Sequence, residues 1–156
     1  MPLSLLNSVR TIEVKENEKM NEQENTKLAG QMYETFVAGD IEAFLNLFSD
    51  DVVWQSPEIE NVPLGGKLSG RENLAGFISS IDEYEEFLKM EPTEFIAQGD
   101  RVVVLGNYLA RSKTTDKQYA TDFAHIITVK DGKITSFYEF FDNAAAGRAH
   151  SAAKAA

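Results

Sequence analysis

Residues 118–142 read QYATDFAHIITVKDGKITSFYEFFD. Apolar and polar side chains alternate along most of this stretch, a pattern typical of strands with one buried face. Asp131 and Gly132, near its middle, form a two-residue hairpin signal. The sequence therefore predicts two long antiparallel strands, at 118–130 and 133–142.

The same period of two extends upstream of this hairpin. Two further strands are predicted at 87–98 and 101–112, joined by a two-residue turn at 99–100. A looser turn at 114–117 leads into the next strand. Four long strands in succession predict a meander, and strands of this length twist and coil.

Before the meander the apolar period is that of helices. A first helix is predicted from about residue 25 to 39, and a second begins at Asp40, a good capping residue. A short strand is predicted at 51–55. After it, the sequence Ser-Gly-Arg-Glu at 69–72 predicts a capping box, in which the side chain of Ser69 accepts a hydrogen bond from the backbone N–H of Glu72. This box would open a third helix.

Three helices followed by a meander predict an α+β domain with its helices on one face of the sheet. The curved antiparallel sheet should wrap around the N-terminal helices as a half-open cone. Such a cone leaves a cavity at its wide end, which is a common site for a small apolar organic ligand.

The predicted domain spans residues 25–143. Residues 1–24 are rich in Glu, Lys and Asn, so we expect a mobile or loosely docked arm. Residues 144–156 are alanine-rich and predict a low-complexity tail, at most a frayed helix, without chemistry of its own.

Charge and composition exclude several classes of function. The net charge of −10 opposes binding to nucleic acid or to anionic lipid, and no apolar run approaches the roughly 20 residues of a membrane span. The chain has no cysteine, and its two histidines lie far apart, so neither a disulfide nor a metal site is expected. It has no glycine-rich phosphate loop. We expect a cytoplasmic protein that needs no cofactor.

The hairpin register predicts which side chains share the inner face of the sheet. It places His125 opposite Tyr138 and Phe123 opposite Phe140. The predicted inner face consists of Val102, Val104, Gly106, Tyr108, Phe123, His125, Ile127, Tyr138, Phe140 and Asp142. Glu139 falls on the other face, with the apolar Leu105, Ile126, Phe137 and Phe141. That face is too apolar to be wholly solvated, which predicts a homodimer formed sheet to sheet.

Several short motifs, in a consistent order and spacing, together resemble a known family. They are Ala38 to Asp40, Leu47 to Trp54, Gly66 to Arg71, Gly99 to Val104, Ala124-His125, Val129 to Ile134 and Phe140 to Asp142. With them the chain resembles the SnoaL-like polyketide cyclase branch of the nuclear transport factor 2-like superfamily, which includes ketosteroid isomerase. The resemblance implies the cone-shaped fold. It leaves function open among cyclases, isomerases, epoxide hydrolases, dehydratases and binding proteins.

The chain departs from two enzymes of that superfamily. Ketosteroid isomerases have a catalytic aspartate before a proline, where this chain has Ser56 and Pro57. Limonene epoxide hydrolases have a catalytic aspartate that would match Asp142, but their arginine and second aspartate fall on Tyr108 and Ala110. Neither activity is therefore transferred to this chain.

His125 is the main catalytic candidate. An imidazole in an apolar pocket is held neutral and can act as a base or acid near pH 7. Asp142 or Tyr138 could assist it by orienting the ring or donating a hydrogen bond. The alternative is a core histidine satisfied by Tyr138 or by a backbone carbonyl.

The remaining candidates would contact the ligand. Trp54 could stack on it at the pocket mouth, and Glu58 or Glu60 in the rim loop could replace the missing base. Tyr33 lies one position from the isomerases' oxyanion tyrosine, which would match Met32, so core packing is favoured for it. Tyr108, Phe123 and Phe140 would form the walls.

Two functions follow from these predictions. The first is a cofactor-free general acid–base enzyme of the cyclase, isomerase or dehydratase type, acting on a small apolar carbonyl compound. The second is a protein of the same fold that binds a ligand or assembles through its sheet without turnover.

Overall fold

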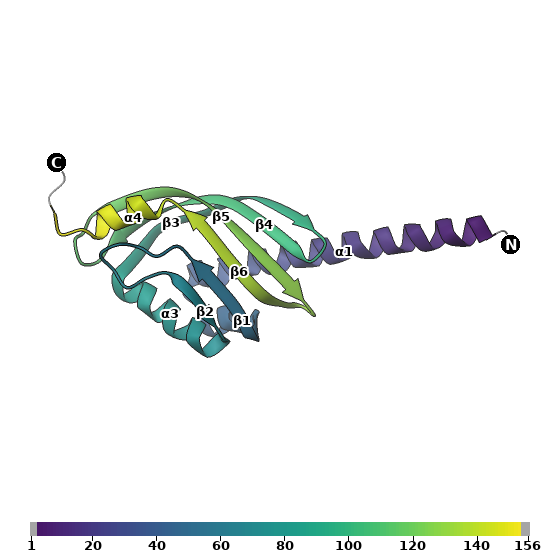
Figure 1. The fold of residues 1–156 in the computed structure, drawn as a ribbon, viewed down its shortest axis with the longest axis horizontal. Coiled ribbons are helices and arrows are strands. Elements are labelled where there is room, and N and C mark those ends of the chain that lie inside the picture. Colours follow the sequence, from purple (N-terminus) through teal and green to yellow (C-terminus); the bar gives the residue numbers. More distant parts are fainter. Residues whose placement is uncertain (1–2, 154–156) are drawn as a thin grey trace.

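One strongly curved sheet organises the molecule (Figure 1). The computed structural model describes residues 3–153. Along the chain its elements are α1 (Leu3–Ala38), α2 (Ile41–Asn46), β1 (Phe48–Ser56), β2 (Gly66–Ser69), α3 (Arg71–Tyr84), β3 (Glu85–Gln98), β4 (Arg101–Ser112), β5 (Gln118–Lys130), β6 (Lys133–Phe141) and α4 (Asn143–His150).

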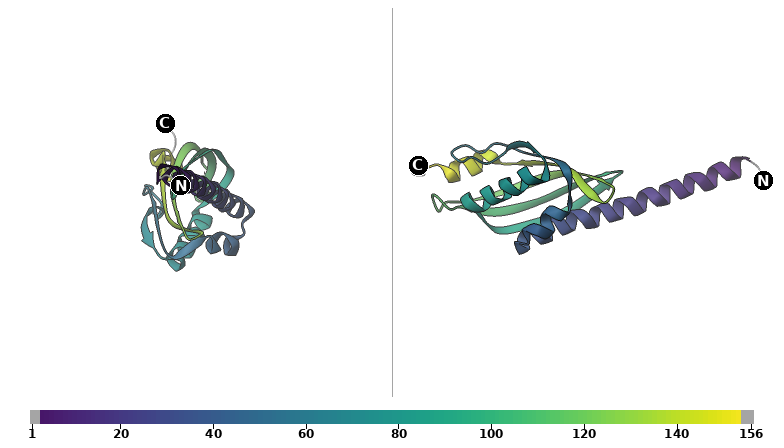
Figure 2. Two further views of the ribbon diagram at one scale, coloured as in Figure 1. Left: turned by 90° about the vertical axis from the view of Figure 1, so that its right-hand side faces the viewer. Right: turned by 90° about the horizontal axis from the view of Figure 1, so that it is seen from below.

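The six strands lie in the order β2-β1-β6-β5-β4-β3. Neighbouring strands are antiparallel except β1 and β6, which run parallel. The C-terminal part of α1 packs against β3 and β4, and α3 packs against β1 and β2, so the sheet wraps around helices on one side (Figure 2). The predicted α+β architecture is confirmed.

The hairpin at Asp131 and Gly132 is confirmed in detail. Both residues have positive φ angles, 51° and 73°, as a type I′ turn requires. Lys130 pairs with Lys133 and Val129 with Ile134, as predicted. Beyond Ile134, however, the register shifts.

The shift is a β-bulge at Thr135. Thr128 pairs with Ser136, so Thr135 is opposite no residue of β5 in the strand register, and every later residue of β6 faces the opposite side from the one predicted. His125 therefore pairs with Glu139, not with Tyr138.

This bulge makes the predicted inner face wrong for β6 and leaves it right for β4 and β5. Val102, Val104, Tyr108, Phe123, His125 and Ile127 are buried as predicted. Tyr138 and Phe140 instead lie on the outer face, where Phe140 is 45% exposed. Phe137, Glu139 and Phe141 have taken their place inside.

The predicted capping box is also wrong. The N-cap of α3 is Gly70, at φ 94°, and no side chain bonds the helix terminus. Ser69 still belongs to β2, one residue before the cap. The helix thus begins one residue later than the Ser-to-Glu spacing requires.

The two ends of the chain are both helical. Residues 3–24 are the first turns of the long helix α1, and nearly all of them are exposed as α1 projects from the body (Figure 1). Whether this arm is mobile stays a prediction. At the opposite end, α4 is packed rather than frayed, with Ala146, Gly147, Ala149 and His150 buried. None of the described helices is long and apolar enough to cross a membrane.

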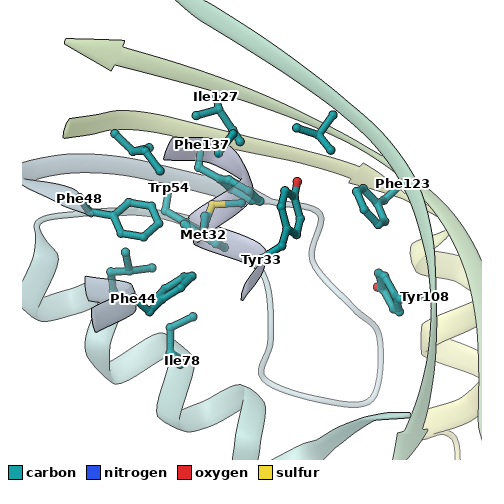
Figure 3. Close-up of a cluster of buried hydrophobic side chains, with 14 of the residues drawn as sticks. Met32, Tyr33, Phe44, Phe48, Trp54, Ile78, Tyr108, Phe123, Ile127 and Phe137 are labelled. Atoms are coloured by element: carbon teal, nitrogen blue, oxygen red, sulfur yellow. The ribbon is translucent and has the colours of Figure 1, made fainter. Parts of the chain in front are cut away.

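The core lies between the helices and the inner face of the sheet. Figure 3 shows Tyr33 from α1 between the cluster around Phe44 and Ile78 on one side and Phe123 and Tyr108 on the other. Aromatic rings dominate this layer. Trp54 stacks on Phe137 with ring centroids 3.7 Å apart, which ties β1 to β6.

Candidate functional site

A cavity of about 80 Å³ lies between the helices and the inner face of the sheet. Its walls are mainly apolar and come from most of the fold: Met32 and Phe36 from α1, Phe77 and Ile78 from α3, Trp54 from β1, Phe87 and Met90 from β3, and Phe137 and Phe141 from β6. Few polar side chains reach it. They are Tyr33, Ser56, Glu85, Tyr108, His125 and Glu139.

Three of these polar residues form one chain of hydrogen bonds. The hydroxyl of Tyr33 lies 2.6 Å from Nδ1 of His125, and Nε2 of the same ring lies 2.6 Å from Oε2 of Glu139. The three residues come from α1, β5 and β6. Because of the bulge at Thr135, Glu139 lies opposite His125 and can take part in these hydrogen bonds.

This geometry fixes the roles of the two ring nitrogens when the imidazole is neutral. A carboxylate can only accept, so Nε2 carries the proton and donates to Glu139. Nδ1 then accepts from the Tyr33 hydroxyl. Burial raises the pKa of Tyr33 strongly, and the negative charge of Glu139 raises it further, so the hydroxyl keeps its proton.

His125 is held rigidly as well as hydrogen-bonded. The side chain is almost completely buried, and its ring stacks on Phe123 with centroids 4.1 Å apart. The ring of Phe137 also packs against the imidazole, with centroids 4.7 Å apart. Because neither nitrogen is free, His125 can position Glu139 and relay a proton, but a ligand cannot reach an unused ring nitrogen.

In this series of hydrogen bonds, the free acceptor is the second carboxylate oxygen of Glu139. Its Oε2 is bonded to His125, and among residues 3–153 no donor reaches Oε1. Its side chain is 17% exposed and lines the cavity. An oxygen with this environment can accept a proton or a hydrogen bond from a bound molecule.

The predicted site residues fall into two groups. His125, Trp54 and Tyr108 line the cavity, and Phe123 lies directly behind His125. Tyr138 and Phe140 point away from it, for the register reason given above.

Asp142 and Glu58 also lie outside the cavity. Asp142 is the N-cap of α4, where its Oδ1 accepts from the backbone N–H of Ala145 at 3.0 Å. It ends the strand and begins a helix, so it cannot orient His125. Glu58 is exposed, whereas its neighbours Pro57 and Ile59 line the cavity. Ser56, at the position of the isomerase aspartate, is buried and also lines it.

The sequence analysis missed a second polar cluster. Glu85, the first residue of β3, accepts from the Tyr119 hydroxyl at 2.7 Å and from Nε2 of His150 at 2.8 Å, all on Oε1. The three side chains are buried. No local pattern links them, because they lie on β3, β5 and α4. Within the described part of the chain, no group of three His, Cys, Asp or Glu side chains could hold a metal ion.

A signal for Glu139 does exist in the sequence. Thr135 and Ser136 are two small polar residues in succession, which interrupts the alternation after Ile134 and is compatible with a bulge. A carboxylate placed opposite a histidine on the next strand would then have been the natural inference.

The six-stranded curved sheet, the helices on its concave side and the cavity between them define the nuclear transport factor 2-like class of proteins. Residues 29–137 match the SnoaL-like domain family. The chain belongs to this family, which confirms the resemblance found in the sequence.

Similar solved structures support the same assignment. A nuclear transport factor 2-like protein from Burkholderia xenovorans LB400 is 33% identical, with a TM-score of 0.75 over 83% of this chain and 98% of that chain. A second such protein, of unknown function, from Burkholderia pseudomallei K96243 is 27% identical, with a TM-score of 0.76 over 83% and 98%. TerC, co-crystallised with polyporic acid, is 31% identical, with a TM-score of 0.74 over 81% and 98%. No curated protein matches the chain.

Proposed function

We propose that the protein is a cofactor-independent enzyme that moves a proton on a small, mainly apolar carbonyl compound. The Tyr33–His125–Glu139 chain of hydrogen bonds, at the wall of an apolar cavity, is the observation that supports this proposal. The reaction would be of the isomerase, cyclase or dehydratase type, in which a C–H next to the carbonyl gives up its proton.

Glu139 is the proposed proton acceptor. Its Oε1 has no partner within residues 3–153, whereas Oε2 is held by His125. The His125 hydrogen bond keeps the carboxylate in place at the wall of the apolar cavity, where a C–H of the bound compound can approach its free oxygen. His125 is a positioning residue here, and Tyr33 fixes its tautomer.

Trp54 is the proposed donor for the ligand oxygen. It lines the cavity, and its buried Nε1 has no hydrogen-bond partner in the described part of the chain. Buried donors of this kind nearly always have a partner. Because Nε1 has almost no accessible surface, a carbonyl oxygen of the bound compound would reach it only when neighbouring side chains shift.

Size restricts the ligand. The cavity of about 80 Å³ is smaller than an engineered cavity of about 150 Å³ that holds benzene. Even a molecule with a single ring must therefore displace side chains, and the flexible Met32 and Met90 in the wall make this feasible. The similarity to TerC supports including polyporic acid among the compounds tested.

The test combines binding with proton exchange. Small enones, lactones, aromatic polyketide-like compounds and polyporic acid are first screened by thermal shift, where a ligand at 100 times its Kd should stabilise the fold by about 2.7 kcal/mol. Exchange of the α-carbon hydrogens of each bound carbonyl compound with D₂O is then followed by NMR. Glu139→Gln should bind the compound and slow the exchange about 10²–10⁴-fold.

Glu94→Gln is the matched control, because Glu94 is exposed on β3 and does not line the cavity. It should exchange at the wild-type rate. Unchanged exchange in Glu139→Gln would contradict the assignment of the base.

A second function has its own support. Both nitrogens of His125 are satisfied inside the protein, as in a core histidine, and Ser56 replaces the isomerase carboxylate. These observations favour a protein that binds a ligand without turnover. Tight binding without any exchange of the α-hydrogens would select this alternative.

A further inference from the structure

Glu85 is a buried carboxylate with a fixed environment. The residue is 4% exposed, and Oε1 accepts from both Tyr119 and His150. Burial raises the pKa of Tyr119, and the charge of Glu85 raises it further, so this hydroxyl stays a donor. The surroundings therefore hold Glu85 as a hydrogen-bond acceptor.

Its second oxygen is free. No donor among residues 3–153 reaches Oε2 of Glu85, and Glu85 lines the same cavity as Glu139. The two glutamates thus repeat one arrangement: one oxygen is bonded to a histidine, and the other has no partner in the described chain.

The C-terminal helix α4 supplies the histidine that bonds Glu85. Asp142 caps α4, and the buried small residues Ala146, Gly147 and Ala149 let the helix pack closely. A Cβ at Gly147 would lie 3.2 Å from Cβ of Glu60, in the loop that follows β1. This packing places His150 within hydrogen-bond distance of Glu85.

We propose that Glu85 is a second ligand-binding group of the cavity, which accepts a hydrogen bond from a hydroxyl or N–H of the ligand, and that His150 is its positioning residue. The inference rests on the proposed function, since it assumes that the cavity binds a small molecule. The inference restricts the ligand to a mainly apolar molecule that carries a hydrogen-bond donor at the end facing Glu85. Ligand carboxylates are disfavoured, because Glu85 and Glu139 would repel them.

Phenol and anisole test this proposal, because they differ in one donor. Their affinities for the full-length protein are measured by NMR titration at millimolar concentrations. Phenol should bind about tenfold more tightly than anisole, as expected for one hydrogen bond to a charged acceptor. Glu85→Gln keeps an oxygen for Tyr119 and should reduce the preference to about threefold or less. Glu94→Gln, which lies outside the cavity, should retain it.

Three results would overturn the inference in distinguishable ways. Equal binding of phenol and anisole by the wild type would exclude Glu85 as an acceptor while leaving the cavity as a binding site. Loss of the preference in Glu139→Gln alone would move the acceptor to Glu139. Binding of neither compound would contradict the proposed function together with the inference.

His150 is tested by a pair of variants. His150→Gln can still donate to Glu85 and should retain most of the preference for phenol, whereas His150→Ala should lose it. Both variants remove the ring from the core, so a role in packing alone would affect them alike. Equal preferences in the two variants would show that His150 does not position Glu85.

Discussion

His125 illustrates how a buried imidazole is kept in one state. The residue is 3% exposed, so water cannot satisfy its nitrogens, and each unsatisfied nitrogen would cost about 1–3 kcal/mol. Tyr33 and Glu139 provide one partner each. Phe123 stacks on the imidazole and Phe137 packs against it, which leaves the ring little freedom to rotate.

Tyr33→Phe should therefore destabilise the fold without creating a large cavity. The variant leaves Nδ1 of His125 buried and unpartnered, and we expect the free energy of unfolding to fall by about 1–3 kcal/mol. Chemical denaturation measures this change. Tyr84→Phe is the control, because Tyr84 lies at the half-buried end of α3, and it should change the stability by less than about 0.5 kcal/mol. Equal effects of the two variants would contradict the role of the Tyr33 hydroxyl.

At the scale of the elements, the bulge at Thr135 decides which residues reach the cavity. Most of the strands, the Asp131-Gly132 turn and the inward faces of β4 and β5 were predictable, since period and turn chemistry are local. The inner face of β6 was not, because the favourable stacking of Phe137 on Trp54 involves a strand more than eighty residues earlier. The cluster around Glu85 depends on the packing of α4, which composition alone describes as low complexity.

Deleting Thr135 should keep the inner and outer faces of β6. Without the extra residue, Ser136 follows Ile134 directly and still pairs with Thr128, so Glu139 stays opposite His125. The deletion should therefore cost less stability than Phe137→Ala, which removes the ring stacked on Trp54 and should cost about 3–5 kcal/mol. Urea denaturation compares the two variants. A deletion at least as costly as Phe137→Ala would contradict the role of Thr135 as the extra residue of the bulge.

The two terminal helices should contribute very differently to stability. Residues 3–20 are exposed, so their removal should change the free energy of unfolding by less than about 0.5 kcal/mol. Removing α4 exposes buried residues and deprives Glu85 of one donor, which we expect to cost more than about 2 kcal/mol. Chemical denaturation of both truncated chains tests the contrast, and a costly first truncation would show that the projecting turns of α1 are part of the fold.

For the whole molecule, alkaline pH should be destabilising. Burial raises the pKa of Tyr33, Tyr108 and Tyr119 above the ordinary tyrosine value of 10.0, so the folded state keeps these protons. The unfolded chain releases them above about pH 10, and stability must then fall as pH rises, by up to about 1.4 kcal/mol per pH unit for each group. Denaturation between pH 8 and 12 should show a plateau followed by this decline. A flat profile to pH 12 would contradict it.

We also propose that two copies pair through the outer face of the sheet. This face carries exposed apolar side chains, with Ile96 47% and Phe140 45% exposed. Phe140→Lys should shift a dimer toward monomer in analytical ultracentrifugation. Val37→Lys, which replaces an exposed apolar residue near the end of α1, should not. A wild-type protein that sediments as a monomer at tens of micromolar would exclude this pairing.

The opposite placement of α1 and α4 has a practical consequence for labelling the protein. The 36 residues of α1 extend over about 54 Å at 1.5 Å per residue. A fluorophore or an immobilisation handle attached near Leu3 is thus held well clear of the domain, on the side away from α4 (Figure 1). The same attachment after Ser151 would disturb the packing of α4, which carries His150. Labels should therefore be attached at the N-terminal end. If labels at the C-terminal end alone reduce ligand affinity, the packing of α4 is coupled to the cavity.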